Sequence, residues 1–200
     1  MIDFIHNDPE FRELLSIVSS IKGLDITLVE KDYWIMHTLY SLKQQGIEFE
    51  LKGGTSLSKG YGLIHRFSED IDIHIRTNFG LITEGNEDKA HIKTARKEFY
   101  DVLAQSISIN GIDEIVRDYE FDDTDKYRSG GIRLNYKSFT PTLQSLKDGI
   151  LLEAGFDTVT PNTPIDISSW VMEHLLSINA QMNYINNTAI GVLCYHPGYT

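Results

Sequence analysis

Residues 51–75 read LKGGTSLSKGYGLIHRFSEDIDIHI, and this stretch decides the predicted fold. Apolar and charged side chains alternate over residues 47–52, which is the pattern of a half-buried strand. Gly53-Gly54-Thr55 follows at once, where a backbone has to turn sharply. Either Thr55 or Ser56 can cap a short helix after this turn, and the N–H groups at a helix start suit a phosphate. The stretch therefore predicts a strand, a glycine turn and a phosphate-binding helix start.

A second strand is predicted at the end of the same stretch. Residues 70–75 alternate between polar and apolar side chains, so Asp70, Asp72 and His74 share one face of a strand. Carboxylates two residues apart lie roughly 6.5–7 Å apart at their Cα atoms and can converge on one or two divalent cations. The alternative is a strand edge with solvated acidic side chains. The preceding glycine turn favours the cation site, because it supplies a phosphate cradle beside the carboxylates.

Glu153 is a further candidate carboxylate. It lies within residues 149–156, a largely apolar run that predicts another strand, and a lone buried charge there is costly without a partner. A metal ion shared with Asp70 and Asp72 would be such a partner. An isolated glutamate on an edge strand is the alternative, and both interpretations stay open at this point.

The sequence also offers cations that could contact a phosphate or an RNA. Lys31 lies on a helix predicted over residues 27–45 and Arg133 on a strand predicted over residues 131–137, but neither pattern fixes where the side chain points. A helix predicted over residues 87–109 carries a basic face. The members of this face are Lys89, Lys93, Arg96 and Lys97. It is either a solvated surface or a contact for RNA or a triphosphate.

These motifs together resemble those of the AbiEii/AbiGii-type nucleotidyltransferase toxins, a branch of the polymerase-beta-like nucleotidyltransferases. The central match is Gly53-Gly54-Thr55-x-Leu57 followed by Arg66-Phe67-Ser68-x-Asp70-Ile71-Asp72. Two further stretches are similar to family segments, Glu30-Lys31-Asp32-Tyr33-Trp34 and Gly149-Ile150-Leu151-Leu152-Glu153. The resemblance spans residues 27–156, with a weaker match at the end of the chain.

The resemblance implies transfer of a nucleoside monophosphate from a nucleoside triphosphate (NTP) to an acceptor hydroxyl, with release of pyrophosphate. It implies that Asp70, Asp72 and Glu153 bind Mg²⁺ or Mn²⁺, and that Glu153 is available as a proton acceptor. The residues implied for nucleotide binding are Gly53, Gly54, Thr55, Ser56, Lys31 and Arg133. RNA, which is tRNA in some relatives, is the implied acceptor, and a cognate antitoxin is the implied partner of a toxin or phage-defence protein.

Two other functions stay open. The acceptor could be a protein side chain or a small molecule, which a formal net charge of −11 mildly favours over a large RNA. The chain could also be a non-catalytic interaction module on the same fold. The intact glycine turn, Asp-x-Asp pair and Glu153 argue against such a module, since a degenerate copy has little reason to keep all three.

The composition is that of an ordinary soluble globular protein, with 41% hydrophobic and 24% charged residues. Cys194 is the only cysteine, which excludes an internal disulfide bond and a cysteine-based zinc cluster. No stretch approaches the roughly 18 apolar residues of a membrane span, and the N-terminal residues lack the pattern of a signal peptide. We therefore expect a cytoplasmic protein with no membrane partner.

The order of the predicted elements indicates an α+β fold, a mixed sheet with flanking helices similar to the nucleotidyltransferase core. Asp8 is the expected N-cap of a first helix that begins at Pro9, and Thr27 and Glu30 match a capping box for the second. The remaining predicted elements are strands over residues 112–121 and 190–194 and a helix over residues 168–180.

We expect one domain over residues 1–200, with the active-site motifs in a core over about residues 25–156. Pro161 and Pro164 mark a boundary after this core. The resemblance implies that residues 157–200 begin a C-terminal portion whose next helix starts with a Glu-Lys pair. Lys31, Lys59 and Arg133 are the available substitutes for that lysine. We therefore expect these 200 residues to bind Mg²⁺ and nucleotide weakly and to transfer poorly or not at all.

Overall fold

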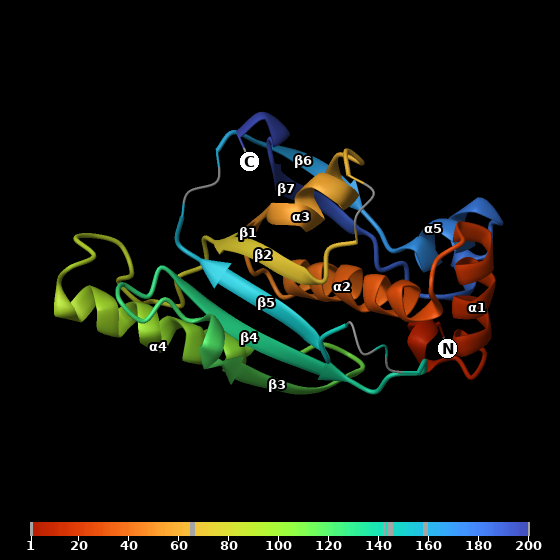
Figure 1. Cartoon of the computed structure of the whole chain (residues 1–200), viewed down its shortest axis with the longest axis horizontal. Helices are drawn as coiled ribbons and strands as arrows, with labels where there is room; N and C mark the ends of the chain where they lie inside the picture. The colour runs from red at the N-terminus through yellow and green to blue at the C-terminus, as the bar shows by residue number, and fades with distance from the viewer. Residues whose placement is uncertain (1, 65–66, 142, 144–145, 158–159, 200) are drawn as a thin grey trace.

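The structure is a computed structural model that describes residues 2–64, 67–141, 143, 146–157 and 160–199. Arg66 of the central motif lies outside these residues. One mixed sheet of seven strands forms the centre of the molecule (Figure 1). The strands are β1 (Phe49–Lys52), β2 (Asp70–Ile75), β3 (Ile112–Asp118), β4 (Ser129–Tyr136), β5 (Ile150–Gly155), β6 (Asn162–Ile167) and β7 (Ala189–Tyr195). The predicted α+β fold with a mixed sheet is confirmed.

The order of the strands across the sheet is β3-β4-β5-β2-β1-β7-β6. β2 pairs in parallel with β5, and β1 pairs in parallel with β7. The other neighbouring pairs are antiparallel. β1 and β2, the two strands of the central motif, therefore lie in the middle of the sheet. β6 and β7 extend the same sheet, so residues after 157 complete the layer that holds the predicted core.

Five α-helices surround the sheet within the described residues. They are α1 (Phe11–Lys22), α2 (Ile26–Gln44), α3 (Gly53–Thr55), α4 (Ala90–Ser106) and α5 (Trp170–Ser177). Short helical turns are η1 (Ile5–Asn7), η2 (Ser56–Gly60), η3 (Tyr119–Phe121), η4 (Gln181–Asn183) and η5 (Pro197–Tyr199). α2 packs along one face of the sheet and α4 lies beside β3 and β4 (Figure 1). No helix among the described residues is both long and apolar enough to cross a membrane.

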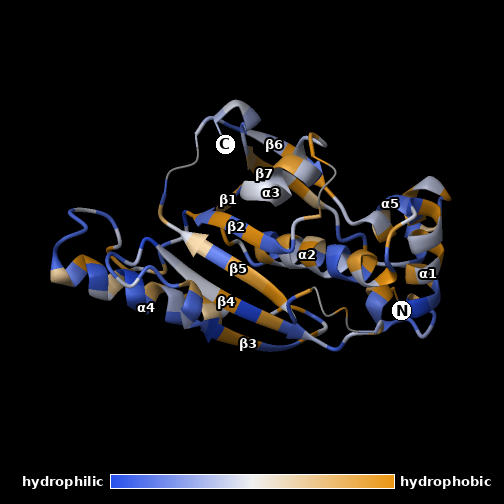
Figure 2. Ribbon diagram, viewed as in Figure 1, coloured by the Kyte–Doolittle hydropathy of each residue, from blue (hydrophilic) through white to orange (hydrophobic). Residues whose placement is uncertain are grey.

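The alternation of side chains in β2 separates a core face from a polar face. Ile71 and Ile73 are fully buried, whereas Asp70 and Asp72 are only half-buried. Figure 2 shows hydrophilic and hydrophobic bands alternating along β2, and a hydrophilic band that interrupts the hydrophobic β5. Burial of the apolar face against α2 fixes which side of the sheet holds the carboxylates.

The starts of the first two helices differ from the predictions. α1 begins at Phe11, and Asp8 accepts a hydrogen bond from the N–H of Glu10 in the preceding turn. α2 is capped by Asp25, whose carboxylate accepts from the N–H of Thr27 at 2.8 Å. The predicted capping box of Thr27 and Glu30 is therefore wrong. Asp25 takes this role because α2 begins at Ile26, so the free N–H groups at its start lie within reach of the Asp25 side chain.

β6 was not predicted from the sequence, because Pro161 and Pro164 were taken to mark a boundary. It is the outermost strand next to β7, and Pro164 lies opposite Leu193. An edge strand tolerates proline, since one side of its backbone needs no hydrogen-bond partner. The predicted strand over residues 112–121 ends at Asp118, where η3 begins.

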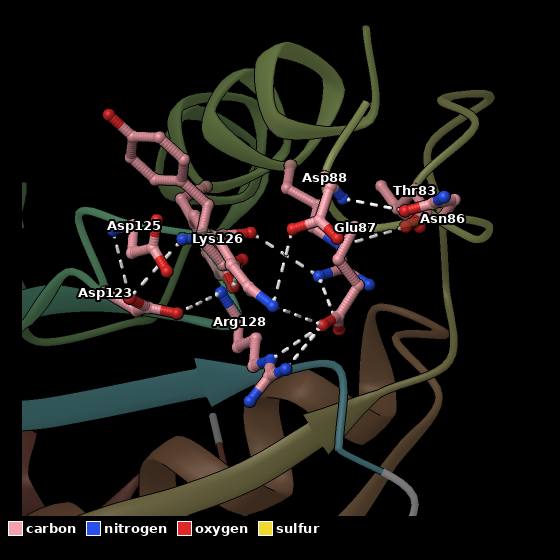
Figure 3. A network of polar contacts seen from close by, with 11 residues as sticks. Thr83, Asn86, Glu87, Asp88, Asp123, Asp125, Lys126 and Arg128 are labelled. Carbon is pink, nitrogen blue, oxygen red and sulfur yellow. Dashed lines mark hydrogen bonds and ion pairs between the residues drawn. The ribbon is translucent and has the colours of Figure 1, made fainter. Parts of the chain in front are cut away.

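Two of the four residues of the predicted basic face, Lys93 and Arg96, form ion pairs. Arg96 is buried, where its Nε donates to the carbonyl of Thr83 and its Nη1 to Glu87. Arg128 also donates to Glu87, as Figure 3 shows, and Lys93 lies 3.6 Å from Asp125. The hydrogen bonds from Arg128 and Arg96 lower the pKa of Glu87 to about 2. This network does not favour α4 as a surface for RNA or triphosphate.

A buried polar network joins the N-terminal turn, α2 and the segment before β7. His37 Nε2 contacts the carbonyl oxygen of Asn110 at 3.0 Å, and its Nδ1 contacts the side-chain Nδ2 of Asn187 at 3.1 Å. Since the carbonyl can only accept and the amide nitrogen can only donate, His37 is neutral with the proton on Nε2. Burial and the neighbouring His6 lower the pKa of His37 to about 3.

We predict that acid destabilises the fold through His37. The unfolded chain takes up a proton on His37 below about pH 6.5, whereas the native state keeps it neutral, so stability falls as the pH falls. Between about pH 7 and about pH 5 the loss is on the order of 2 kcal/mol. Chemical denaturation across this range measures it. His37→Gln should reduce this pH dependence, whereas the substitution of exposed His91 by Gln should not; equal pH dependence in all three proteins would contradict the prediction.

Candidate active site

Three adjacent strands bring candidate residues together on the polar face of the sheet. Asp72 of β2 lies opposite Glu153 of β5 in the parallel pairing. It also lies opposite Lys52, the last residue of β1, in the antiparallel pairing. Paired residues on neighbouring strands point to the same face. Lys52, Asp72 and Glu153 therefore form a row across the sheet, and Asp70 lies two residues from Asp72 on the same face.

Gly53 turns the chain directly beside Asp72. Its φ angle is +67°, and an added Cβ atom would lie 2.1 Å from Asp72 Oδ2. Gly54 is also closely packed, since an added Cβ atom there would lie 2.8 Å from Ser68 Oγ. The two glycines are thus required by the close approach of the turn to the carboxylate face, as well as by the positive φ of Gly53.

The side chains of Thr55 and Ser56 do not cap the helix, so that prediction is wrong. α3 begins at Gly53, with Lys52 at the N-cap position and no side-chain cap. Thr55 Oγ1 donates to the carbonyl oxygen of Asp70 at 2.9 Å, and Ser56 Oγ donates to that of Tyr195 at 3.3 Å. These hydroxyls fasten the glycine turn to the end of β7 and the start of β2.

Burial and neighbouring carboxylates raise the pKa values of Asp72 and Glu153. Burial raises the pKa of Asp72, and Asp70 adds to this rise while Lys52 opposes it. Burial also raises the pKa of Glu153, with further contributions from Asp72 and Asp70. Lys147 and Lys52 partly offset that rise. The site therefore concentrates negative charge, which a bound cation would neutralise.

Asp70 offers an oxygen atom that no group of the described residues hydrogen-bonds. Its Oδ1 atom is buried and has no hydrogen-bond partner, and its Oδ2 atom lies 3.6 Å from Lys147 Nζ. Oxygen donors of this kind are the ligands that Mg²⁺ and Mn²⁺ prefer. In the part of the chain that the structure describes, no three acidic, histidine or cysteine side chains are grouped closely enough to hold a metal ion as they stand. The carboxylate oxygens of Asp70, Asp72 and Glu153 are suitable ligands for a divalent cation, but these side chains have to move closer together to share one.

A family profile described as nucleotidyl transferase AbiEii toxin, type IV TA system, matches residues 34–200. The chain belongs to the AbiEii family. Its relationship to the AbiEii-type nucleotidyltransferase toxins, expected from the motifs, is thereby confirmed, and the profile assigns these toxins to type IV toxin–antitoxin systems. Comparison with curated proteins gave no match.

In this AbiEii-family chain, the stretch Glu30-Lys31-Asp32 ties three loops to the start of α2. Glu30 accepts hydrogen bonds from the N–H groups of Phe139 and Thr140. Lys31 is only 2% exposed, and its Nζ donates to Glu69 Oε2 at 3.1 Å and to the carbonyl of Lys147 at 2.7 Å. The buried position does not favour the predicted contact of Lys31 with nucleotide, and its contacts instead support the residues around Asp70.

Lys59 is also bound away from the carboxylates. Its Nζ lies 2.6 Å from Asp32 Oδ1 and packs over the ring of Trp170. Asp32 accepts a second hydrogen bond from the N–H of Trp170. Lys59 therefore does not offer a free ammonium as a substitute for a phosphate-binding lysine.

Arg133 lies on the polar face, in register with Leu151 of β5, which pairs with Asp70. Its guanidinium group forms an ion pair with Asp118 at 2.5 Å. Sequence reasoning missed Lys52 and Lys147, which flank the carboxylates from opposite sides. Lys52 directly precedes the glycine turn, and that adjacency was a usable signal. Lys147 lies in a loop with no repeating pattern, so its position could not be predicted from the sequence.

We predict that Gly53→Ala destabilises the AbiEii-family fold more than Gly62→Ala. Both glycines have a positive φ, +67° and +62°, but an added Cβ atom at Gly62 meets nothing within 4 Å. Gly62→Ala is the matched control, and backbone strain alone should lower its free energy of unfolding by about 1 kcal/mol. Gly53→Ala should show the same loss and a further one, because its Cβ atom displaces the Asp72 carboxylate. Urea denaturation compares the two variants, and equal losses would contradict the close approach at Gly53.

Proposed function

We propose that the chain transfers a nucleoside monophosphate from an NTP to a hydroxyl group of RNA, with divalent-cation assistance. The observation that carries this proposal is the register of β2 with β5, which sets Asp72 beside Glu153 with Asp70 on the same face. The glycine turn lies against this group of carboxylates. Membership in a family of nucleotidyltransferase toxins supports the same reaction.

Asp70, Asp72 and Glu153 are the residues that would hold Mg²⁺ or Mn²⁺. Such ions, when bound, neutralise the triphosphate and lower the pKa of an attacking hydroxyl. The unpartnered Oδ1 of Asp70 supports this assignment, because a buried carboxylate oxygen without a donor is costly. Burial raises the pKa values of Asp72 and Glu153, and the neighbouring carboxylates add to this rise, which a bound cation would oppose.

The remaining groups of the chain orient the substrates. The backbone N–H groups of the glycine turn suit the phosphates, and Lys52 next to them supplies a positive charge. In the reaction the acceptor oxygen bonds to the α-phosphorus, and the bond from the α-phosphorus to the bridging oxygen breaks. Pyrophosphate leaves with that electron pair. Glu153, on the same face as Asp72, accepts the acceptor proton.

The acceptor and the partner protein are the finer parts of the proposal. RNA, including tRNA, is the acceptor that the resemblance implies, and a protein side chain or a small molecule is the alternative. We further propose that the protein acts as a cytoplasmic toxin under the control of a cognate antitoxin. A non-catalytic module would have no use for three crowded carboxylates whose negative charge is only partly offset.

The decisive test is incubation with each labelled NTP, Mg²⁺ and total cellular RNA, followed by separation of RNA, protein and small molecules. Transfer should be weak, and the label that is transferred should appear on RNA. The double variant Asp70→Ala and Asp72→Ala should lose transfer and keep its fold, because removing one side of a like-charge cluster relieves repulsion. Exposed Asp113→Ala on β3 is the matched control and should transfer like the unmodified chain. Transfer by the double variant at the unmodified rate would remove both aspartates from the reaction.

A second prediction concerns the metal itself. Mg²⁺ or Mn²⁺ should raise the melting temperature, and more so with NTP, because a ligand that binds only the native state stabilises it. Glu153→Gln should reduce this rise less than Asp72→Ala does, if Glu153 serves one ion and Asp72 serves two. Thermal melts with and without metal measure the effect. An identical rise in Glu153→Gln and the unmodified chain would place Glu153 outside the metal shell.

A further inference from the structure

An aromatic ring covers the polar face of the sheet beside the carboxylates. Gly131 of β4 lies opposite Glu153, and an added Cβ atom on Gly131 would lie 2.7 Å from Phe121 Cβ. The absence of a side chain at Gly131 thus leaves room for Phe121, the last residue of η3. Phe121 is only half-buried and is not part of the hydrophobic core.

Two cations flank this ring. Lys147 Nζ lies 5.1 Å from the centre of the Phe121 ring, and the Arg133 guanidinium carbon lies 5.7 Å from it. The same Lys147 ammonium is 3.6 Å from Asp70 Oδ2, so the ring and the carboxylates share a neighbour. Phe121, Arg133 and Lys147 therefore form one surface that continues the carboxylate site toward β4. We call it the Phe121 platform.

The backbone of Lys147 is held in place from both sides. Its N–H donates to Glu69 Oε2 at 3.2 Å, and its carbonyl accepts from Lys31 Nζ at 2.7 Å. Lys31 and Glu69 themselves form an ion pair, with Lys31 buried. The side chain of Lys147 is nevertheless 51% exposed. A fixed backbone with an exposed ammonium is an arrangement suited to a ligand that arrives from solvent.

Building on the proposed function, we propose that the Phe121 platform binds the end of a single-stranded RNA acceptor. The terminal base stacks on Phe121 and the exposed Lys147 contacts the phosphate that precedes it, while Arg133 packs on the ring and stays paired with Asp118. Aromatic rings interleaved with cations are the usual means of holding single strands without reading their sequence. The terminal hydroxyl is then delivered to the carboxylates, because Lys147 lies between the ring and Asp70.

The Phe121 platform and the glycine turn lie on different sides of the carboxylates. Lys52 and the glycine turn lie on the β1 side of Asp72, whereas the platform lies on the β5 and β4 side. The triphosphate and the acceptor therefore approach the carboxylates from opposite sides. Such an arrangement matches an in-line displacement, in which the attacking and leaving oxygens lie opposite each other.

The platform favours RNA over a protein acceptor. A protein side chain presents no base to stack and no row of phosphates, so a ring between two cations would contribute little to its recognition. In a chain with a net charge of −11, a local pair of cations beside an aromatic ring is the kind of site that can bind RNA without a broad basic surface.

The test measures binding without turnover. The probe is a short single-stranded RNA whose terminal nucleotide carries 2-aminopurine and lacks both ribose hydroxyls, so that no transfer takes place. Stacking quenches its fluorescence and gives the Kd. Phe121→Ala should weaken binding about tenfold, since stacking of one base on an aromatic ring is worth about 1–3 kcal/mol. Phe121→Leu keeps most of the apolar volume, and it should fold normally and show the loss of quenching.

Tyr119 supplies the matched control. It is 62% exposed and also has a cation, Arg117, over its ring at 4.9 Å, but it lies beside α4 residues Asp101 and Ala104. Tyr119→Ala should bind the probe RNA like the unmodified chain. Lys147→Met should reduce the dependence of log Kd on log salt concentration by about 0.7, the value for one phosphate contact on a single strand.

A second titration separates this inference from the proposed function. A fluorescent non-hydrolysable NTP with Mg²⁺ should bind the unmodified chain and Phe121→Leu equally well. If the nucleotide binds but Phe121→Ala and Phe121→Leu hold the probe RNA as tightly as the unmodified chain, the platform is not the acceptor site and the proposed function stands. If labelled NTP marks a protein and not RNA, the platform is not the acceptor site and the RNA acceptor of the proposed function is wrong as well. If no nucleotide binds the unmodified chain, the proposed function itself fails.

Discussion

The parallel pairing of β2 with β5 is the constraint on which the candidate site depends. It sets Asp72 opposite Glu153, although the two residues belong to distant parts of the chain. Because side chains alternate between the two faces of a strand, a slip of one residue would turn Glu153 into the core and Leu152 onto the polar face. The fully buried Leu152 and Ile71 therefore fix the position of the carboxylates as firmly as the backbone hydrogen bonds do.

The crowded carboxylates repel one another and lower the stability of the fold, and the surrounding residues reduce this repulsion. Asp72 and Glu153 have raised pKa values because they are buried near other carboxylates. Lys52 and Lys147 offset part of this repulsion from opposite sides. Lys147 is in turn positioned by the buried pair of Lys31 and Glu69. The charged stretch Glu30-Lys31-Asp32 at the start of α2 thus supports the carboxylate site through Lys31.

The predictions that failed share a physical cause. The capping box at Thr27 and the cap at Thr55 rested on local rules, whereas the Thr27 hydroxyl donates to the carbonyl of Pro141 and the Thr55 hydroxyl to that of Asp70. Of the basic face, Arg96 is buried against Glu87 and Thr83, while Lys89 and Lys97 are exposed. β6 was missed because proline in a strand is acceptable only at an edge, and position in a sheet is not a local property.

By itself, the sequence determined the local elements of the site: the alternation that makes β1 and β2 strands, the glycine turn between them, and the face that Asp70 and Asp72 share. These features have short-range causes, namely side-chain periodicity and the backbone freedom of glycine. Only the tertiary structure decided that Glu153 lies next to Asp72, that Lys52 and Lys147 flank them, and that Phe121 covers Gly131. Those contacts join residues far apart in the chain, and strand register and packing of the core set them together.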